Sequence, residues 1–141
     1  MKFRYAIVLI VAVLLVGGSA LMAVGLADPT IRANVPFAFR VGNEFMPAGQ
    51  YKVTHINTRY LLMIRSVDTQ ATILVHSVPS GKDAGDSAKL VFNRYGETYF
   101  LRQVWIPGTD ANELLWSKTE KEYASRWSGP ERATVVGVTE K

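Results

Sequence analysis

No cysteine occurs among the 141 residues of this chain. The sequence therefore excludes disulfide bridges, thiolate metal centres and a cysteine nucleophile. Hydrophobic residues make up 48% of the composition. A stable domain has to rest on packing and hydrogen bonding alone, and a chain of this length can bury enough surface to do so.

An excess of charge of one sign is also missing. The chain has 16 Lys and Arg residues and 12 Asp and Glu residues, which gives a formal net charge of +4. Without Lys2 and Arg4 the balance falls to 14 against 12. No basic block or stripe stands out along the chain, so a nucleic-acid partner is not expected.

Residues that bind metals or act as nucleophiles are few. The only histidines, His55 and His76, lack other ligands at close spacing and are expected to be ordinary strand residues. Residues 79–87 (PSGKDAGDS) match neither a phosphate-binding P-loop nor a calcium loop and predict a solvated surface loop. No G-x-S-x-G motif occurs. We therefore predict no catalytic residue, no metal site and no cofactor.

The N-terminus has the layout of a secretory signal peptide. Lys2 and Arg4 precede an apolar run over residues 6–16, and Gly25 and Ala27 are the small residues that a signal peptidase recognises. An uncleaved membrane anchor is the alternative, because residues 6–27 carry no charge. We expect an exported protein, periplasmic or extracellular, that meets a membrane only if this segment is retained. Residues 28–141 then form a single domain.

Short alternating segments predict a mainly β fold. Residues 31–41 place apolar side chains at every second position, which is typical of a half-buried strand. Turn residues separate the further candidate strands, which are 50–56, 61–67, 71–78, 89–95 and 98–106. The sequence predicts six or seven short antiparallel strands in a sandwich or a partly open barrel, with one helix near the C-terminus.

Two tight turns are predicted from local chemistry. Met46-Pro47-Ala48-Gly49 fits a hairpin loop with Gly49 in the left-handed region, which would set Phe45 opposite Tyr51. A second hairpin around Asp68-Thr69 would set Ile64 opposite Ile73 and Leu62 opposite Val75, although Thr69 suits a two-residue turn poorly and favours a longer one.

The periodicity changes after residue 109. Asp110 and Glu113 have the spacing of a capping box, and apolar residues then recur every four positions, which predicts a helix over residues 110–126. Residues 133–138 follow as either a last strand or a loose tail.

Four segments together resemble a group of small, uncharacterised secreted bacterial proteins. These segments are "VPFAFRVGNEFMPAGQYKV", "LLMIRSVD", "KLVFNRYGETYFLRQVWIPG" and "NELLWSKTEKE". The group has a PF-x-F opening, a PAG-x-Y turn, an L-x-F-x-R-Y-G hairpin and a helix that begins E-L. One departure is Asp68-Thr69, where such proteins have Asp-Gly. The resemblance implies export and a β-rich architecture and carries no known activity.

The hairpin over residues 89–106 supplies the candidate binding site. A turn at Gly96-Glu97 pairs Tyr95 with Thr98, Asn93 with Phe100 and Val91 with Arg102. Leu90, Phe92, Leu101 and Trp105 make the better core face, so the opposite face, with Asn93, Tyr95, Phe100 and Arg102, is expected to be exposed and to bind. The alternative is that Tyr95 and Phe100 pack under the predicted helix, with Leu115 and Tyr123 covering them.

The sequence thus favours an exported, non-catalytic protein that acts through surface contacts. The expected partner is an envelope protein or a glycan. One alternative is a carrier that holds an apolar or sugar ligand inside a barrel. The other is a hydrolase with a carboxylate pair that the fold would assemble.

Overall fold

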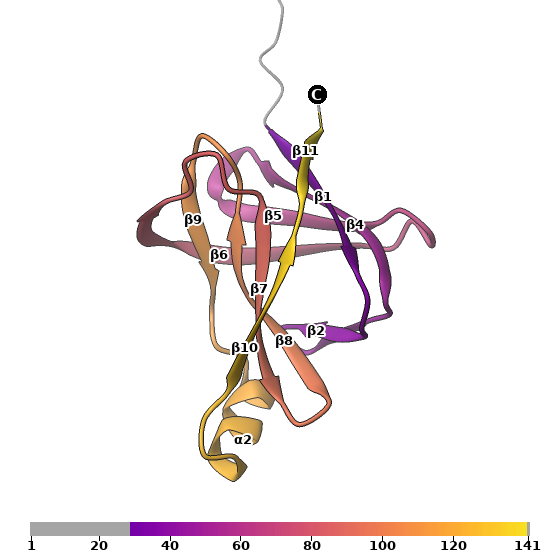
Figure 1. Ribbon diagram of the computed structural model, residues 1–141, viewed down its shortest axis with the longest axis vertical. Coiled ribbons are helices and arrows are strands. Elements are labelled where there is room, and N and C mark those ends of the chain that lie inside the picture. Colours follow the sequence, from indigo (N-terminus) through magenta and orange to yellow (C-terminus); the bar gives the residue numbers. More distant parts are fainter. Residues whose placement is uncertain (1–28, 141) are drawn as a thin grey trace, which may run out of the picture.

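The computed structural model describes residues 29–140 and shows a mainly β chain with one helix near the C-terminal end (Figure 1). The predicted signal peptide or anchor, residues 1–27, lies outside the described residues. The elements are β1 (Thr30–Val35), β2 (Phe39–Val41), β3 (Glu44–Met46), β4 (Gly49–Ile56), β5 (Thr58–Ser66), β6 (Thr72–Asp83), β7 (Lys89–Tyr95), β8 (Thr98–Trp105), β9 (Asp110–Leu114), α2 (Lys118–Arg126), β10 (Glu131–Val136) and β11 (Val138–Glu140). The predicted fold class is confirmed, and the strands are more numerous than expected.

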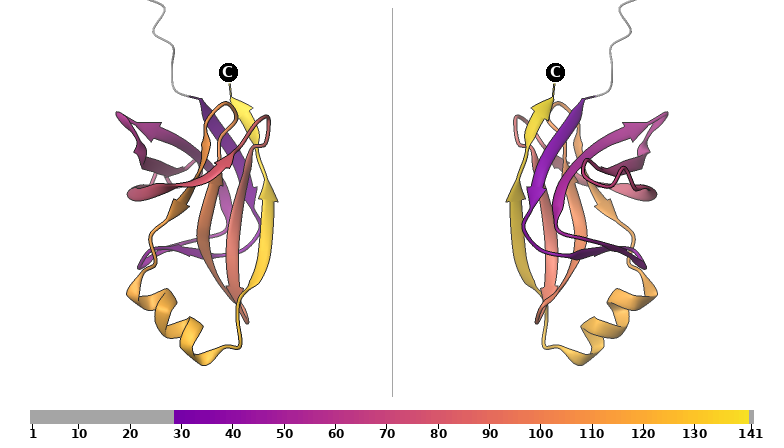
Figure 2. Two further views of the ribbon diagram at one scale, coloured as in Figure 1. Left: turned by 90° about the vertical axis from the view of Figure 1, so that its left-hand side faces the viewer. Right: turned by 90° about the vertical axis from the view of Figure 1, so that its right-hand side faces the viewer.

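The strands form an 11-stranded sheet that is not closed into a barrel. Their order is β10-β7-β8-β9-β6-β5-β4-β1-β11, and the β2–β3 hairpin attaches to β8. The sheet folds back on itself into two layers (Figure 2). The long strand β6 joins the layers, because its first part pairs with β5 and its last part with β9.

The hydrophobic core lies between these layers. One side contributes alternate residues of β1, β4 and β5, and the other contributes alternate residues of β7 and β8, as expected for strands with one face on a core. The largest fully buried apolar side chains include Tyr51, Phe39, Phe92, Ile31, Leu62, Ile64, Leu90 and Leu101. Phe39 lies at the centre of this core, with its ring edge-to-face against Tyr51 and Phe92 at centroid distances of 5.0 and 5.3 Å.

The chain after α2 is a pair of strands rather than a loose tail. β10 pairs with β7 and β11 pairs with β1, so the chain passes from one layer to the other at Gly137. The Gly137 amide donates to the Ala88 carbonyl oxygen at 2.8 Å. A Cβ at this position would lie 3.0 Å from the Arg32 carbonyl oxygen, so the crossing leaves little room for a side chain.

The hairpin predicted at residues 46–49 is wrong. β3 pairs with β2 around Gly42 and Asn43, so Phe45 opposes Arg40 instead of Tyr51. β4 pairs with β1, and the segment between Met46 and β4 is a connection between strands that are not neighbours. Gly42 has a φ of 60°, and this conformation is what a two-residue primed turn demands of its first residue.

Gly49 still needs to be glycine, for another reason. Its φ is 155°, outside the predicted left-handed helical conformation but also unfavourable for a residue with a Cβ. An added Cβ would lie 2.5 Å from Asp68 Oδ2, and that carboxylate accepts a hydrogen bond from the Gln50 amide at 3.2 Å. The close approach of Asp68 therefore depends on the missing side chain.

The β5–β6 hairpin has the predicted register. Ile64 opposes Ile73 and Leu62 opposes Val75. The turn is longer than two residues: the Ser66 amide donates to the Ala71 carbonyl at 2.8 Å, and Gln70 takes the positive φ of 64°. The longer loop relieves Thr69 of a conformation that β-branched residues disfavour.

The β7–β8 hairpin turns where the sequence predicts, with Tyr95 opposite Thr98 and Asn93 opposite Phe100. The third predicted pair, Val91 with Arg102, is wrong, because a bulge after Val91 shifts the register by one residue. The shift carries Val104 into the core, where it is fully buried. Such bulges bend a strand and re-aim the side chains on either side of them.

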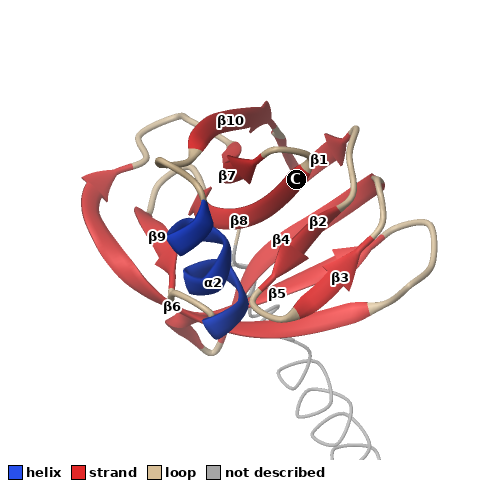
Figure 3. Cartoon of the chain, turned by 90° about the horizontal axis from the view of Figure 1, so that it is seen from below, coloured by secondary structure: helices blue, strands red, loops and turns tan. Residues whose placement is uncertain are grey.

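The predicted helix begins eight residues too early. Residues 110–114 form strand β9, and α2 begins only at Lys118. The cap is Ser117, whose hydroxyl accepts from the Glu120 amide at 3.1 Å, in place of the predicted capping residue Asp110. Because Gln103 and Val104 of β8 pair with β9, the Asp110 segment is held in the sheet. Viewed from below, α2 lies across one end of the folded sheet (Figure 3).

Candidate functional site

The four predicted binding residues are buried. Asn93 and Arg102 are 2% exposed, and Tyr95 and Phe100 are 1% exposed. The expectation of an exposed face is therefore wrong, and the alternative of packing under the helix is closer to the structure. Tyr123 of α2 contacts the Phe100 ring at a centroid distance of 5.4 Å. Leu115 is 58% exposed and does not cover either ring.

Glu120 is the residue of α2 that holds this face. Its Oε1 accepts from Asn93 Nδ2 at 2.9 Å and from the Tyr95 hydroxyl at 3.2 Å, and its Oε2 accepts from Arg102 Nη1 at 3.3 Å. Arg102 also reaches Glu113 of β9 at 3.3 Å. We refer to Asn93, Tyr95, Arg102, Glu113 and Glu120 as the Glu120 cluster.

Burial governs the protonation of this cluster. Desolvation raises the pKa of the Glu120 carboxyl above its ordinary value, against the hydrogen bond from Asn93 and the charge of Arg102. Burial and then the charge of Glu120 raise the pKa of the Tyr95 hydroxyl. The Arg102 guanidinium lies over the Trp116 ring at 4.3 Å from its centroid, so it is enclosed on that side as well.

This arrangement bears on the hydrolase alternative. Glu113 and Glu120 are carboxylates near one another, but both bind Arg102. Glu120 is 2% exposed, and both of its carboxylate oxygens already accept hydrogen bonds from within the chain. Among residues 29–140 the cluster links α2 to the sheet, with both carboxylates bound to the one guanidinium of Arg102.

A second polar network lies around His55. His55 Nε2 is 2.7 Å from Asn112 Oδ1, while Asn112 Nδ2 donates to Ser77 Oγ at 2.9 Å and to the Arg59 carbonyl oxygen. Asn112 separates the histidine from the serine, so the two do not form a base and nucleophile pair. The network ties β4, β6 and β9 together. In the described part of the chain, no group of three or more acidic, histidine or cysteine side chains is placed to hold a metal ion.

The loop predicted over residues 79–87 is shorter than expected. β6 continues to Asp83 across a register shift after Pro79, and Asp83 pairs with Asp110 of β9. The remaining turn is exposed apart from Ala84. Its solvation is as the sequence predicts.

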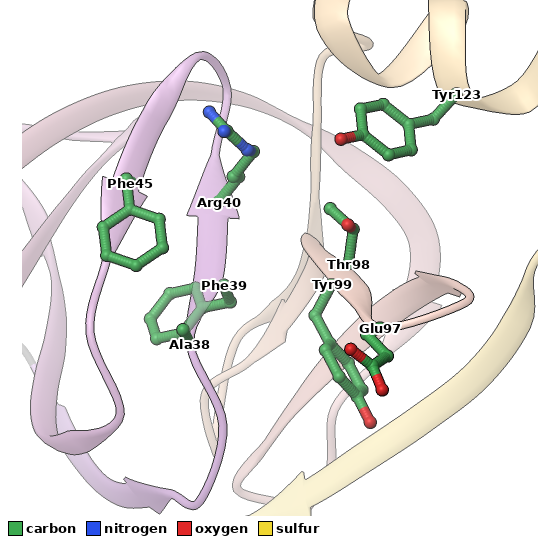
Figure 4. A pocket seen from close by; sticks show the side chains of 8 residues that line it. All are labelled: Ala38, Phe39, Arg40, Phe45, Glu97, Thr98, Tyr99 and Tyr123. Carbon is green, nitrogen blue, oxygen red and sulfur yellow. The ribbon is translucent and has the colours of Figure 1, made fainter.

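A small groove opens beside α2, outside the predicted face. Figure 4 shows its two walls, with residues of β2 and β3 on one side, residues of the β7–β8 hairpin on the other, and Tyr123 of α2 above them. Its volume is about 130 Å³. We call this the groove, and it is lined by Ala38, Phe39, Arg40, Phe45, Glu97, Thr98, Tyr99 and Tyr123.

The groove follows from the way the β2–β3 hairpin is attached. β2 pairs with β8 in parallel at one position, Arg40 with Phe100, so the hairpin leans on the sheet without extending it fully. The Thr119 hydroxyl of α2 donates to Asn43 Oδ1 in the hairpin turn at 2.8 Å. On the other wall, Tyr99 stacks on Phe37 at a centroid distance of 3.7 Å, which fixes the position of its ring.

The lining of the groove includes one exposed aromatic ring and two charged side chains. Phe45 is 62% exposed, although most phenylalanines of this chain are buried or packed. Within residues 29–140 neither the Arg40 nor the Glu97 side chain has a hydrogen-bond or ion-pair partner. A large exposed aromatic beside an unpaired cation and an unpaired anion is the mixture expected of a contact site.

The sequence contained one signal for this site. Gly42-Asn43 lies between alternating residues, which is a hairpin pattern, and a turn there would have placed Arg40 opposite Phe45. The Met46-Pro47-Ala48-Gly49 turn competed with it and favoured the wrong pairing. Tyr123 and Glu97 come from distant segments, and local pattern had no means of bringing them to the same groove.

No family model, no curated protein and no solved structure matches this chain. Among the described residues, no helix combines the length and the apolar character needed to cross a membrane. The function must therefore be argued from the site itself.

Proposed function

We propose that this chain is an exported, non-catalytic protein of the periplasm or the extracellular space that binds an envelope component at the groove. The observation that carries the proposal is the exposed Phe45 ring beside the unpaired Arg40 and Glu97 side chains. Aromatic and arginine side chains dominate binding energy at contact sites because they combine apolar area with directed hydrogen bonds.

At the groove, the carrier alternative finds less support. Pockets that enclose a small molecule have volumes of roughly 300–1,000 Å³. The groove, at about 130 Å³, is smaller than that range. Its open form suits one unit of a longer ligand better than a whole enclosed molecule.

Retention on envelope material tests the proposal. The purified protein should be retained, and Phe45→Ala should reduce retention by about tenfold or more, because hot-spot aromatics carry a large share of affinity. Leu74→Ala is the matched control, since Leu74 is a comparably exposed apolar residue of β6 outside the groove. Equal retention of the wild type and Phe45→Ala would contradict the proposal.

Export has its own test. The mature protein is expected to begin at Asp28, so intact-mass measurement of material from the cell envelope should show the loss of residues 1–27. A membrane-bound species that retains Met1 would establish the anchor instead.

A further inference from the structure

We propose that the ligand of the groove is a neutral saccharide chain, of which one sugar unit sits between Phe45 and the Tyr99 wall. The inference rests on the proposed function and names the chemical class of its ligand. Three properties of the groove lead to it: its hydrogen-bonding side chains, its aromatic surface, and the short strands at its edge.

The hydrogen-bonding groups demand a ligand that both donates and accepts. A guanidinium such as that of Arg40 only donates, and a carboxylate such as that of Glu97 only accepts. A chain of phosphate or carboxylate groups that fills the groove would satisfy Arg40 but would bring negative charge to Glu97, and a cationic chain would bring positive charge to Arg40. A hydroxyl group donates and accepts, so hydroxyls of successive units along a saccharide chain can satisfy Arg40 on one wall and Glu97 and Thr98 on the other.

The aromatic surface suits the remaining faces of a sugar ring. The face of an aromatic ring carries partial negative charge, and the C–H groups of a pyranose present an apolar, weakly positive face to it. Phe45 offers most of its ring to solvent. Tyr99 stacks on Phe37 and has the Arg94 guanidinium over its ring at 5.5 Å from the centroid, so it forms a fixed wall of the groove, and the free aromatic face is that of Phe45.

A peptide ligand fits the groove less well. One common way in which an extended peptide binds is by adding a strand to a free sheet edge. The strands that wall the groove on this side, β2 and β3, have three residues each. Very short edge strands are one of the means by which proteins prevent such pairing.

Titration with defined oligosaccharides tests the class of ligand. The probes are linear hexasaccharides of glucose, mannose and N-acetylglucosamine, with a hexamer of galacturonic acid as the anionic counterpart. At least one neutral hexasaccharide should bind in calorimetry, and the anionic hexamer should bind more weakly or not at all. Phe45→Ala, Arg40→Ala and Glu97→Ala should each weaken binding by about tenfold, and Leu74→Ala should leave it unchanged.

Three results would overturn the inference: failure of every neutral hexasaccharide to bind, tighter binding of the anionic hexamer, or unchanged binding by Phe45→Ala. Protease treatment of the envelope material separates this failure from that of the proposed function. If Phe45→Ala loses retention but protease removes the retaining component, the groove is a contact site and its ligand is a protein. If Phe45→Ala keeps retention, both proposals are wrong.

Discussion

The Glu120 cluster and the groove lie on either side of Tyr123 and are built from the same kinds of residue. Each contains an arginine, at least one glutamate and at least one aromatic ring. In the cluster, Arg102 and Glu120 bind each other and are 2% exposed. In the groove, among the described residues, Arg40 and Glu97 have no such partners, and Phe45 faces solvent.

The difference shows that residue types alone do not distinguish a binding surface from an internal contact. A mixed polar and aromatic face can be covered by a ligand or by another segment of the same chain. Here α2 covers the face of Asn93 and Arg102. What marks the groove is the exposed Phe45 ring in a hollow that charged side chains also line. Four experiments test this contrast between the Glu120 cluster and the groove.

The largest effect is expected from the buried rings. Tyr95→Ser combined with Phe100→Ser should destabilise the fold by more than about 5 kcal/mol, because truncating a buried aromatic side chain costs about 3–5 kcal/mol. Phe45→Ser should change the free energy of unfolding by less than about 0.5 kcal/mol, as is usual for exposed positions. Denaturant titration of both proteins measures the contrast, and a small effect of the double change would mean that α2 does not cover these rings in solution.

The two arginines should differ next. Arg102→Ala leaves Glu120 buried without its counter-charge, and removing one partner of a buried ion pair costs about 3–5 kcal/mol. Arg40→Ala should stay within about 0.5 kcal/mol. Thermal unfolding of the two variants under identical conditions provides the comparison. Similar melting temperatures for both would show that the Arg102 pair contributes no more than a surface charge.

A smaller, pH-dependent effect is expected from Glu120. Because burial raises its pKa in the folded protein, the fold binds this proton more tightly than the unfolded chain does. The corresponding stability is fully present below the ordinary value of 4.5 and is lost as pH rises through the raised pKa.

The variant Glu120→Gln isolates this contribution, since its amide stays neutral. The stability of the wild type relative to Glu120→Gln should decline as pH rises from about 4.5, and Glu97→Gln serves as the exposed control. Unfolding curves at several pH values give the difference. A wild type that gains on Glu120→Gln with rising pH would mean that the attraction of Arg102 outweighs desolvation.

Much of the fold could be predicted because it depends on local pattern. The β5–β6 register follows from alternation, and the β7–β8 turn follows from Gly96. The C-terminal region was harder, because the Asp110 segment has helical spacing but is paired with β8 and β6 in the sheet. Tertiary pairing outweighed the local helical preference of that segment. Gly137 matters because the chain crosses between the two layers at that residue, which no local pattern indicates.

The site was less predictable than the fold. Pairing along β7 and β8 correctly placed Asn93 beside Phe100, but nothing local revealed that Glu120 would cover them. The groove gathers residues from three separate parts of the chain around a hairpin whose turn was assigned to the wrong glycine. Long-range contacts of this kind leave no periodic trace in a sequence.

Hydrogen–deuterium exchange of the protein bound to its envelope ligand tests the central claim most directly. The account predicts added protection in peptides that contain residues 38–46 and 97–99, with unchanged exchange in α2. Faster exchange in α2 on binding, with new protection around Asn93 and Arg102, would mean that the helix lifts and that the ligand takes the face beneath it. That result would contradict the assignment of the groove as the binding site and of the Glu120 cluster as an internal fastening.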